Sequence, residues 1–293
     1  MEALVPPLLK RLNIYGRLMR VEKPIGTYLV MWPMLWALWI AAEGHPDGFV
    51  VLLFLLGAFL MRSAGCVIND IADRNVDGHV ARTKLRPLAA GEIRTKEALA
   101  LFIVLLLMAA GLLLFLNDLT KMISIGAVVL AILYPFMKRV THLPQIFLGA
   151  AFAWSIPMAF SAIQAGVPLI GWVLLLATIC WVVAYDTMYA MVDRDDDLKI
   201  GVKSTAILFA DYDRLIIGIL QLAMLALLIL VGFMVGLGIL YYFGLVLAAG
   251  LGIYQQLLIQ HRQREACFQA FLNNHYLGGW VFAGLFLDYA TIV

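Results

Sequence analysis

The stretch FVVLLFLLGAFLMRSAGCVINDIADRNVD, residues Phe49 to Asp77, changes from apolar to acidic within a few residues. Residues 49–68 are apolar or small except for Arg62 and Ser63. A helix needs roughly 20 mostly apolar residues to cross a hydrocarbon layer of about 30 Å, so this run is expected to span a membrane. Three aspartates and two asparagines follow at once, which places a polar cluster at one end of the span.

The whole chain has the composition of a membrane protein. Of its 293 residues, 63% are hydrophobic and only 14% are charged, and the mean hydropathy is +0.93. We therefore expect an all-α integral membrane protein in which residues 1–293 form a single membrane domain. Nine runs have the length of a transmembrane helix: Pro24–Ala42, Phe49–Ile68, Ala98–Leu116, Met122–Met137, Pro144–Ile163, Leu169–Met191, Leu215–Val235, Gly238–Leu258 and Asn273–Thr291.

The distribution of positive charge predicts the orientation of these spans. Of the 21 Lys and Arg residues, only Lys121 falls on the connections of the opposite side. Since positive loops stay on the cytoplasmic side, we expect the N-terminus inside and the C-terminus outside a bacterial inner membrane. Two acid-rich connections, 69–96 and 193–214, would then face the cytoplasm. The net charge of +2 and the lack of a long basic tail give no indication of nucleic-acid binding, and membrane lipid is the expected surrounding.

Each acid-rich connection is expected to present one polar helix face. At 3.6 residues per turn, Asp70, Asp73 and Asp77 share a face with Arg62 and Asn69. The second cluster shares a face only if its helix continues beyond the apolar run, and Asp195 would then point to the opposite side. The members of this second face are Asp186, Tyr189, Asp193 and Asp197.

The residue types of the two clusters favour magnesium and phosphate. Carboxylate and amide oxygens without His or Cys are the ligands that Mg²⁺ prefers, and Mg²⁺ commonly bridges them to substrate phosphates. Interleaved basic residues would donate to the same phosphates. The alternatives are ordinary charges that pair at the membrane surface, or the intramembrane acids of a secondary transporter. The basic residues are Arg74, Arg82, Lys84, Arg86, Lys138 and Lys203.

The two clusters resemble the paired motifs of the UbiA-type intramembrane prenyltransferases. The first motif, Asn-x₃-Asp-x₃-Asp, is matched by Asn69, Asp73 and Asp77, followed by ARTKLRPLAAG. The second, Asp-x₂-Tyr-x₃-Asp-x₃-Asp, is matched by the residues from Asp186 to Asp197, followed by KSTA. Further stretches, among them EKPIGTYLVMWPMLWALW and YPFMKRVTHLPQ, are similar to the branch of the family that acts on 4-hydroxybenzoate.

This resemblance implies nine transmembrane helices around a central cavity and a Mg²⁺-dependent reaction. A polyprenyl group would pass from an all-trans polyprenyl diphosphate to the ring carbon ortho to the hydroxyl of 4-hydroxybenzoate, as in ubiquinone biosynthesis. Another acceptor on the same fold, such as dihydroxynaphthoate or haem B, is the alternative. The resemblance names no protein partner.

The resemblance also suggests roles for individual residues. Asn69, Asp73 and Asp77 would hold one Mg²⁺ and Asp193 and Asp197 a second, and these four aspartates are the expected catalytic residues. Asp70 and Asp186 would join the metal sites directly or through water. Arg86 is the first expected diphosphate donor, followed by Arg82, Lys138 and Lys203. Tyr189 would contact substrate, Asp193 is a candidate base for the phenol, and Arg62 would pair with the acceptor carboxylate or with Asp70 or Asp73.

Overall fold

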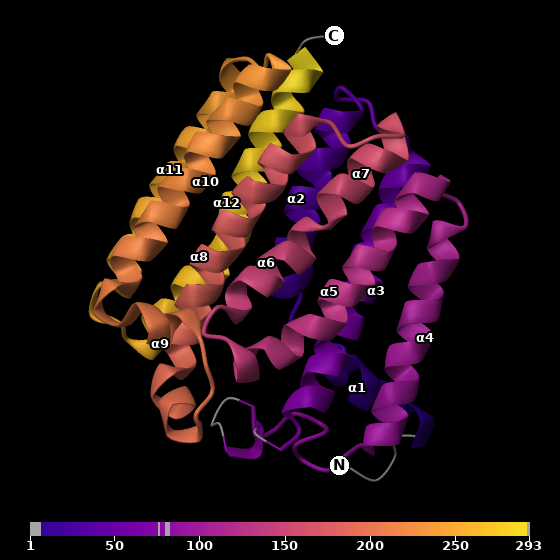
Figure 1. The fold of residues 1–293 in the computed structure, drawn as a ribbon, viewed down its shortest axis with the longest axis vertical. Coiled ribbons are helices and arrows are strands. Elements are labelled where there is room, and N and C mark those ends of the chain that lie inside the picture. Colours follow the sequence, from indigo (N-terminus) through magenta and orange to yellow (C-terminus); the bar gives the residue numbers. More distant parts are fainter. Residues whose placement is uncertain (1–6, 76, 80–82, 292–293) are drawn as a thin grey trace.

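The protein folds into helices, most of which are joined by short connections. The computed structural model describes residues 7–75, 77–79 and 83–291, and within these ranges it contains α-helices and 3-10 turns but no strand. The helices lie side by side along the long axis, with the two ends of the chain at opposite ends of the molecule (Figure 1). The elements are α1 Pro7–Leu18, α2 Ile25–Ala41, α3 Gly48–Asp73, η1 Asp77–His79, α4 Thr95–Leu113, α5 Asp118–Val140, α6 Pro144–Ala153, α7 Ser155–Gln164, α8 Leu169–Ile200, α9 Thr205–Phe209, η2 Ala210–Tyr212, α10 Asp213–Val235, α11 Ile239–Leu258, η3 Ile259–His261 and α12 Arg264–Thr291.

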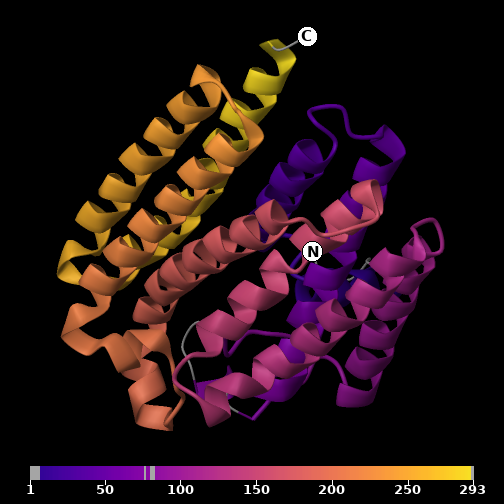
Figure 2. The same cartoon turned by 45° about the horizontal axis from the view of Figure 1, so that its top comes forward.

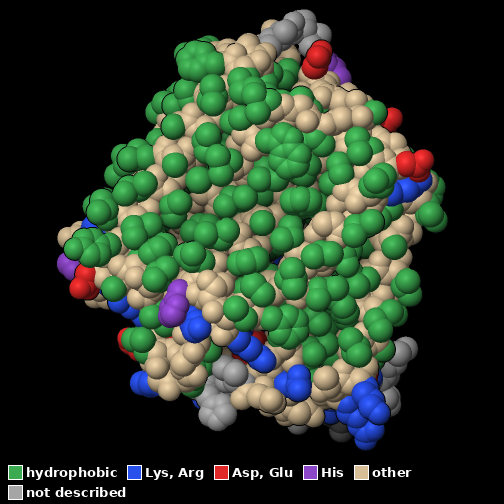
Figure 3. Space-filling view, in the orientation of Figure 1, with side chains coloured by type: hydrophobic (Ala, Val, Ile, Leu, Met, Phe, Trp, Pro, Cys, Tyr) green, Lys and Arg blue, Asp and Glu red, His purple; other side chains and the backbone are tan. Residues whose placement is uncertain are grey.

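The helices identify an integral membrane protein. Among the described residues, seven helical segments are long and apolar enough to cross a membrane, and α2, with 17 residues, is a shorter apolar helix. Each of the nine expected spans coincides with a helix or a helix pair. The last of them lies in α12, which is more polar than the seven apolar segments. Hydrophobic side chains cover the middle of the molecule, and Lys and Arg gather at the end that carries α1 and α9 (Figure 3).

Several helix ends differ from the expected ones. The expected span 144–163 is two helices, because Pro157 has no N–H to donate to the carbonyl of Ala153, where α6 ends. The expected connection 193–214 is wrong in its first part, since α8 continues to Ile200. The N-terminal helix α1 was not expected at all. It lies beside the ends of α3 and α4 rather than among the spans (Figure 1).

The core lies between α2, α8 and α12. Trp36 of α2 is 1% exposed and stacks on Trp181 of α8, with ring centroids 5.3 Å apart. Its Nε1 donates to the carbonyl of Gly278 in α12 over 3.2 Å. The apolar sequence of the first span does not show which of its tryptophans face lipid. Trp36 is buried because its indole ring and its N–H both find partners inside the bundle.

The C-terminal helices α10, α11 and α12 form a group on one side of α8, and α3, α4 and α5 lie on the other side (Figure 2). Helices α11 and α12 touch through glycine. A methyl group on Gly284 would lie 2.9 Å from the Leu240 carbonyl oxygen, and one on Gly244 would lie 2.7 Å from the Trp280 carbonyl oxygen. These contacts are with backbone, which cannot move aside easily. The close approach of the two helices therefore requires glycine at both positions.

We predict that Gly284→Ala destabilises the protein by about 1–3 kcal/mol, because the added methyl group overpacks the α11–α12 contact. The thermal unfolding temperature in detergent should fall. Gly250→Ala on α11 is the matched control, because a methyl group there meets no atom within 4 Å. Equal unfolding temperatures for the two variants would contradict the assigned contact.

Candidate active site

Both acid clusters face one small chamber at the end of the bundle that carries α1 and α9. The chamber has a volume of about 170 Å³ and lies between the end of α3, η1, the end of α5 and the last turns of α8. Two segments more than a hundred residues apart are thus brought together, as the predicted site requires. The predicted residues that line the chamber are Asn69, Asp73, Asp77, Arg86, Lys138, Asp186, Tyr189, Asp193, Asp197 and Lys203.

The second cluster reaches the chamber because α8 is long. No Gly or Pro follows Gly171 until Gly201, whose φ of 72° ends the helix in a left-handed conformation. Asp186, Tyr189, Asp193 and Asp197 therefore lie on successive turns of one face, as predicted for a continuing helix. Asp195 is exposed on the other side of α8.

Ion pairs hold the last turns of α8 in place. Asp213, at the start of α10, is fully buried and accepts from Arg194 over 3.3 Å and from Arg262 over 2.8 Å. Arg264, at the start of α12, donates to Asp196 over 3.2 Å. The acidic turns are thereby braced against α10 and α12.

The first cluster is arranged differently from the prediction. Helix α3 ends at Asp73, so Asp77 does not share a helical face with Asp70 and Asp73. Instead, the guanidinium of Arg86 joins Asp77 to Asp70: its Nη1 lies 2.8 Å from Asp77 Oδ2 and 3.1 Å from Asp70 Oδ1. The hydroxyl of Thr83 donates to the Asp77 carbonyl over 2.8 Å. Burial raises the pKa of Asp77, and the charge of Arg86 opposes this rise.

The carboxylates at the end of α3 are buried and paired with cations. Asp70 is 1% and Asp73 is 2% exposed. Arg20, in the turn between α1 and α2, donates through Nη2 to Asp70 Oδ1 over 2.7 Å, and Lys138 of α5 pairs with Asp73. Burial in a medium of low dielectric constant makes such partners necessary, because an isolated carboxylate there is costly.

Arg20 is a site residue that the sequence did not reveal. It lines the chamber and is one of the basic residues before the first span, where topology alone accounts for positive charge. Its backbone has a φ of 55°, which is uncommon for a residue with a side chain.

Two predicted donors, Arg62 and Lys203, donate to backbone carbonyls. Arg62 lies outside the chamber and donates to the carbonyls of Met19, Arg20 and Lys23, so the expectation that it is a counter-ion of Asp70 or Asp73 is not met. Lys203 lines the chamber, but its amine donates to the Val140 carbonyl over 3.2 Å. Arg82 lies outside the described residues.

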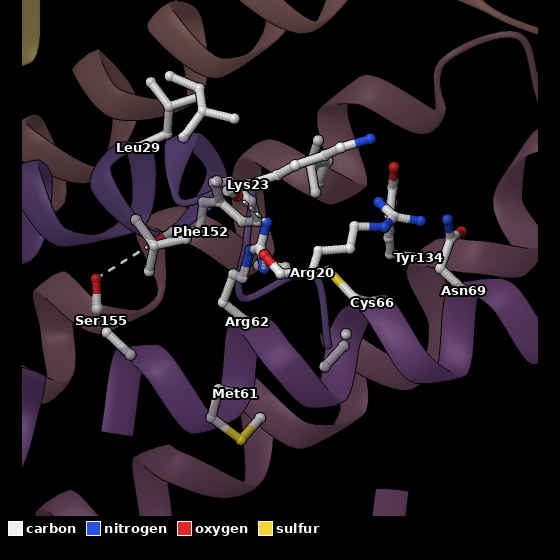
Figure 4. Close-up of a pocket in the computed structure, with 18 of the residues that line it drawn as sticks. Arg20, Lys23, Leu29, Met61, Arg62, Cys66, Asn69, Tyr134, Phe152 and Ser155 are labelled. Atoms are coloured by element: carbon white, nitrogen blue, oxygen red, sulfur yellow. Dashed lines mark hydrogen bonds between the residues drawn. The ribbon is translucent and has the colours of Figure 1, made fainter. Parts of the chain in front are cut away.

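A larger cavity continues from the chamber into the bundle. Its volume is about 1220 Å³, and it shares Arg20, Asn69, Arg86, Tyr134, Asp186, Tyr189 and Asp193 with the chamber. Deeper in the bundle its walls are largely apolar and come from α2, α3, α4, α5 and the α6–α7 pair, with Phe54, Ala110 and Val128 as examples, whereas Lys23 and Arg62 add charge near the chamber. Figure 4 shows the Arg20 side chain pointing toward Tyr134 and Asn69, with Phe152 and Ser155 farther along the cavity.

The oxygen ligands of the chamber fit divalent cations held together with a substrate. Among the described residues, no three Asp, Glu, His or Cys side chains are close enough to hold one ion on their own. Mg²⁺ does not need such a cage, since it is commonly bound by one or two carboxylates, substrate phosphates and water. Asp73 Oδ1 is buried without a hydrogen-bond partner among the described residues, so it has a lone pair to offer.

Fold and site together define a membrane-embedded, all-helical protein with a charged chamber that opens onto an apolar cavity. Residues 30–278 match the sequence model of the UbiA prenyltransferase family. The chain is 58% identical over 275 residues to a 4-hydroxybenzoate octaprenyltransferase of Yersinia enterocolitica, covering 94% of this chain and 96% of that protein. A protein of the same name from Yersinia pestis is 57% identical over the same length. The chain therefore belongs to the UbiA prenyltransferase family.

Solved structures of similar fold agree with this assignment. The apo structure of a UbiA homolog from Aeropyrum pernix K1 superposes with a TM-score of 0.78 at 24% identity, covering 88% of this chain and 97% of that one. A UbiA homolog from Archaeoglobus fulgidus bound to GPP and Mg²⁺ has a TM-score of 0.68 at 17% identity, covering 93% and 99%. At these identities the likeness establishes the fold.

We predict that Lys138→Met lowers kcat/KM for prenyl transfer by roughly 10²-fold, because it removes a cation from the chamber and leaves Asp73 without its partner. Steady-state kinetics in membranes measure the effect. Lys84→Met is the matched control, because Lys84 is exposed. Similar kinetics for both variants would contradict the position given to Lys138.

Proposed function

We propose that this protein transfers a polyprenyl group from an all-trans polyprenyl diphosphate to 4-hydroxybenzoate, in ubiquinone biosynthesis, at the cytoplasmic face of a bacterial inner membrane. The observation that carries the proposal is the meeting of both acid clusters, together with Arg86 and Lys138, in a chamber that opens onto an apolar cavity. Such a cavity suits a substrate with a charged head and an apolar tail. The names of the relatives indicate the acceptor.

The charges that line the chamber support the use of Mg²⁺. Five carboxylates and four basic side chains line it, so the chamber by itself gives no excess of positive charge for a diphosphate. Bound Mg²⁺ would supply that charge and act as a Lewis acid on the leaving group. We propose Asn69, Asp73 and Asp77 on one side, and Asp193 and Asp197 on the other, as the groups that hold it. Asp186 lies between the chamber and the cavity and would act directly or through water.

The reaction breaks the bond between the allylic carbon and the diphosphate oxygen and forms a bond from that carbon to the acceptor ring. In the proposed arrangement, Arg86 and Lys138 stabilise the negative charge that develops on the leaving diphosphate. The apolar cavity walls hold the tail and exclude water, which would otherwise trap the electron-deficient carbon. The ring then loses a proton, and Asp193, at the boundary of the chamber, is the proposed acceptor of a proton from the substrate.

The acceptor is proposed to lie beside a group of basic residues at the cavity wall. Arg20, Lys23 and Arg62 all line the large cavity, and their positive charge suits the carboxylate of 4-hydroxybenzoate. Arg62 already donates to three carbonyls of the turn between α1 and α2. We therefore propose Arg20 as the main partner of the carboxylate, with Arg62 fixing the turn beside it and Tyr189 contacting substrate from α8.

We also propose a role for Asp70 that differs from metal binding. Among the described residues, the partners of its carboxylate are the guanidinium groups of Arg20 and Arg86, and they share Oδ1. Asp70 would then keep the two substrate-binding arginines at a fixed distance from each other, at the edge of the chamber.

We predict that the purified protein in lipid nanodiscs converts a labelled polyprenyl diphosphate and 4-hydroxybenzoate to a prenylated acid, and that the reaction stops with EDTA and resumes with Mg²⁺. Asp73→Ala and Asp193→Ala should each lower the rate by about 10³-fold or more, because each removes a ligand near the leaving group. Asp195→Asn is the control, since Asp195 is exposed away from the chamber. Retained activity in Asp73→Ala or Asp193→Ala would overturn the metal assignment.

We predict that Arg20→Gln raises KM for 4-hydroxybenzoate roughly tenfold or more, because a charge-assisted hydrogen bond is lost. The preference for 4-hydroxybenzoate over its uncharged amide should largely disappear, which a general loss of structure would not cause. Arg74→Gln serves as the control, because Arg74 is exposed and its guanidinium donates to the Ile71 carbonyl. An unchanged preference in Arg20→Gln would place the carboxylate elsewhere.

A further inference from the structure

The N-terminal helix α1 is joined to the active-site end of the bundle by polar contacts of its last turns. Arg17 donates through Nη1 to Glu92 Oε2 over 2.7 Å and through Nη2 to Glu92 Oε1 over 2.8 Å. The same Nη2 donates to the Leu85 carbonyl over 3.0 Å. A planar guanidinium that binds a carboxylate with both nitrogens has a fixed orientation, so Arg17 fixes two points of the segment that follows η1.

That segment, residues 83–92, carries Arg86. Within it, the Arg86 N–H donates to the Thr83 carbonyl over 2.9 Å, and the Ala90 N–H donates to the Arg86 carbonyl over 2.8 Å. The side chain of Leu85 is 73% exposed, so apolar burial does little to hold this part of the segment. The peptide bond that Arg17 contacts joins Leu85 directly to Arg86.

The charges around Asp70 give this tether a role. Arg20 and Arg86 approach the same oxygen of Asp70, at 2.7 Å and 3.1 Å, so two like charges face one carboxylate. The two guanidinium groups repel each other across this oxygen, and on the Arg86 side the repulsion is opposed by Asp77, whose Oδ2 lies 2.8 Å from Arg86 Nη1. Arg62 fixes the turn that carries Arg20. The segment of Arg86 is buried at Thr83 and Pro87 but exposed at Leu85, which is the part that Arg17 contacts.

We propose that Arg17 is a positioning residue for prenyl transfer, which holds the Arg86 segment on α1 so that Arg86 faces the diphosphate. Arg17 contacts neither substrate nor metal in this proposal and acts through Glu92 and the Leu85 carbonyl. The proposal rests on the function proposed above, because it assigns Arg86 to the diphosphate. Its consequence is that α1, which lies outside the spans, is part of the active-site structure.

The test compares Arg17→Ala with Arg11→Ala, a matched control on the same helix. Arg11 pairs with Glu97 in the first turn of α4 over 3.0 Å, and among the described residues it makes no hydrogen bond or ion pair with the segment 83–92. Arg17→Ala is expected to raise KM for the polyprenyl diphosphate about tenfold, with kcat changed less and KM for the acceptor unchanged. Arg11→Ala should match the wild type. The thermal unfolding temperature should fall little in either, since partly exposed ion pairs contribute about 0–1 kcal/mol to stability.

Two further measurements separate positioning from a general structural role. The double variant Arg17→Glu with Glu92→Arg reverses the pair and should bring KM for the diphosphate back to within about threefold of the wild type. Trypsin should cleave after the exposed Lys84 faster in Arg17→Ala than in Arg11→Ala, as shown by mass spectrometry. This second readout does not depend on activity.

The outcomes are distinct. If the wild type transfers no prenyl group, the proposed function fails, and the proteolysis result alone reports on the tether. If the wild type is active but Arg17→Ala has the same KM and cleavage rate as Arg11→Ala, the positioning role is wrong. A structural role would instead be indicated if Arg17→Ala raised KM and lowered kcat by the same factor, lowered the unfolding temperature, and showed no recovery in the reversed pair. That result would also overturn the proposal.

Discussion

The arrangement of the active-site end depends on the burial of Asp70 and Asp73 at the end of a membrane-spanning helix. Carboxylates that are 1% and 2% exposed require partners, and these come from three different parts of the chain. Arg20 comes from the turn after α1, Arg86 from the segment after η1, and Lys138 from the end of α5. Because an unpaired buried charge is costly, the fold places cations beside these carboxylates, and the same cations serve the chemistry.

Much of the fold follows from the sequence alone, because long apolar runs have few alternatives. The second acid cluster was also predictable, since no Gly or Pro interrupts α8 before Gly201 and helical periodicity alone sets its face. The first cluster was not, because the return of Asp77 to the chamber depends on Arg86, a tertiary contact. Trp36 shows a further limit of hydropathy patterns. A lipid-facing and a buried tryptophan occur in the same kind of apolar run, so the sequence does not distinguish them.

Arg20 escaped prediction for a related reason. Basic residues before a first span satisfy the charge rule for topology wherever their side chains point, so sequence gives no sign that one of them enters the site. Only the structure shows that the turn after α1 folds back, that Arg62 donates to its carbonyls, and that Gly26 leaves room for Arg62. A methyl group on Gly26 would lie 2.8 Å from Arg62 Nε.

The position of the chamber at the end of the bundle suits a prenyl diphosphate, which has a charged head and an apolar tail. The diphosphate needs cations and access from water, whereas the tail needs apolar walls, so the bond between them belongs where the two environments meet. Tyr134, Asp186 and Tyr189 line both the chamber and the large cavity, and they mark that boundary. The allylic carbon would lie beside them, close enough to the cations for its leaving group to depart and deep enough for water to be excluded.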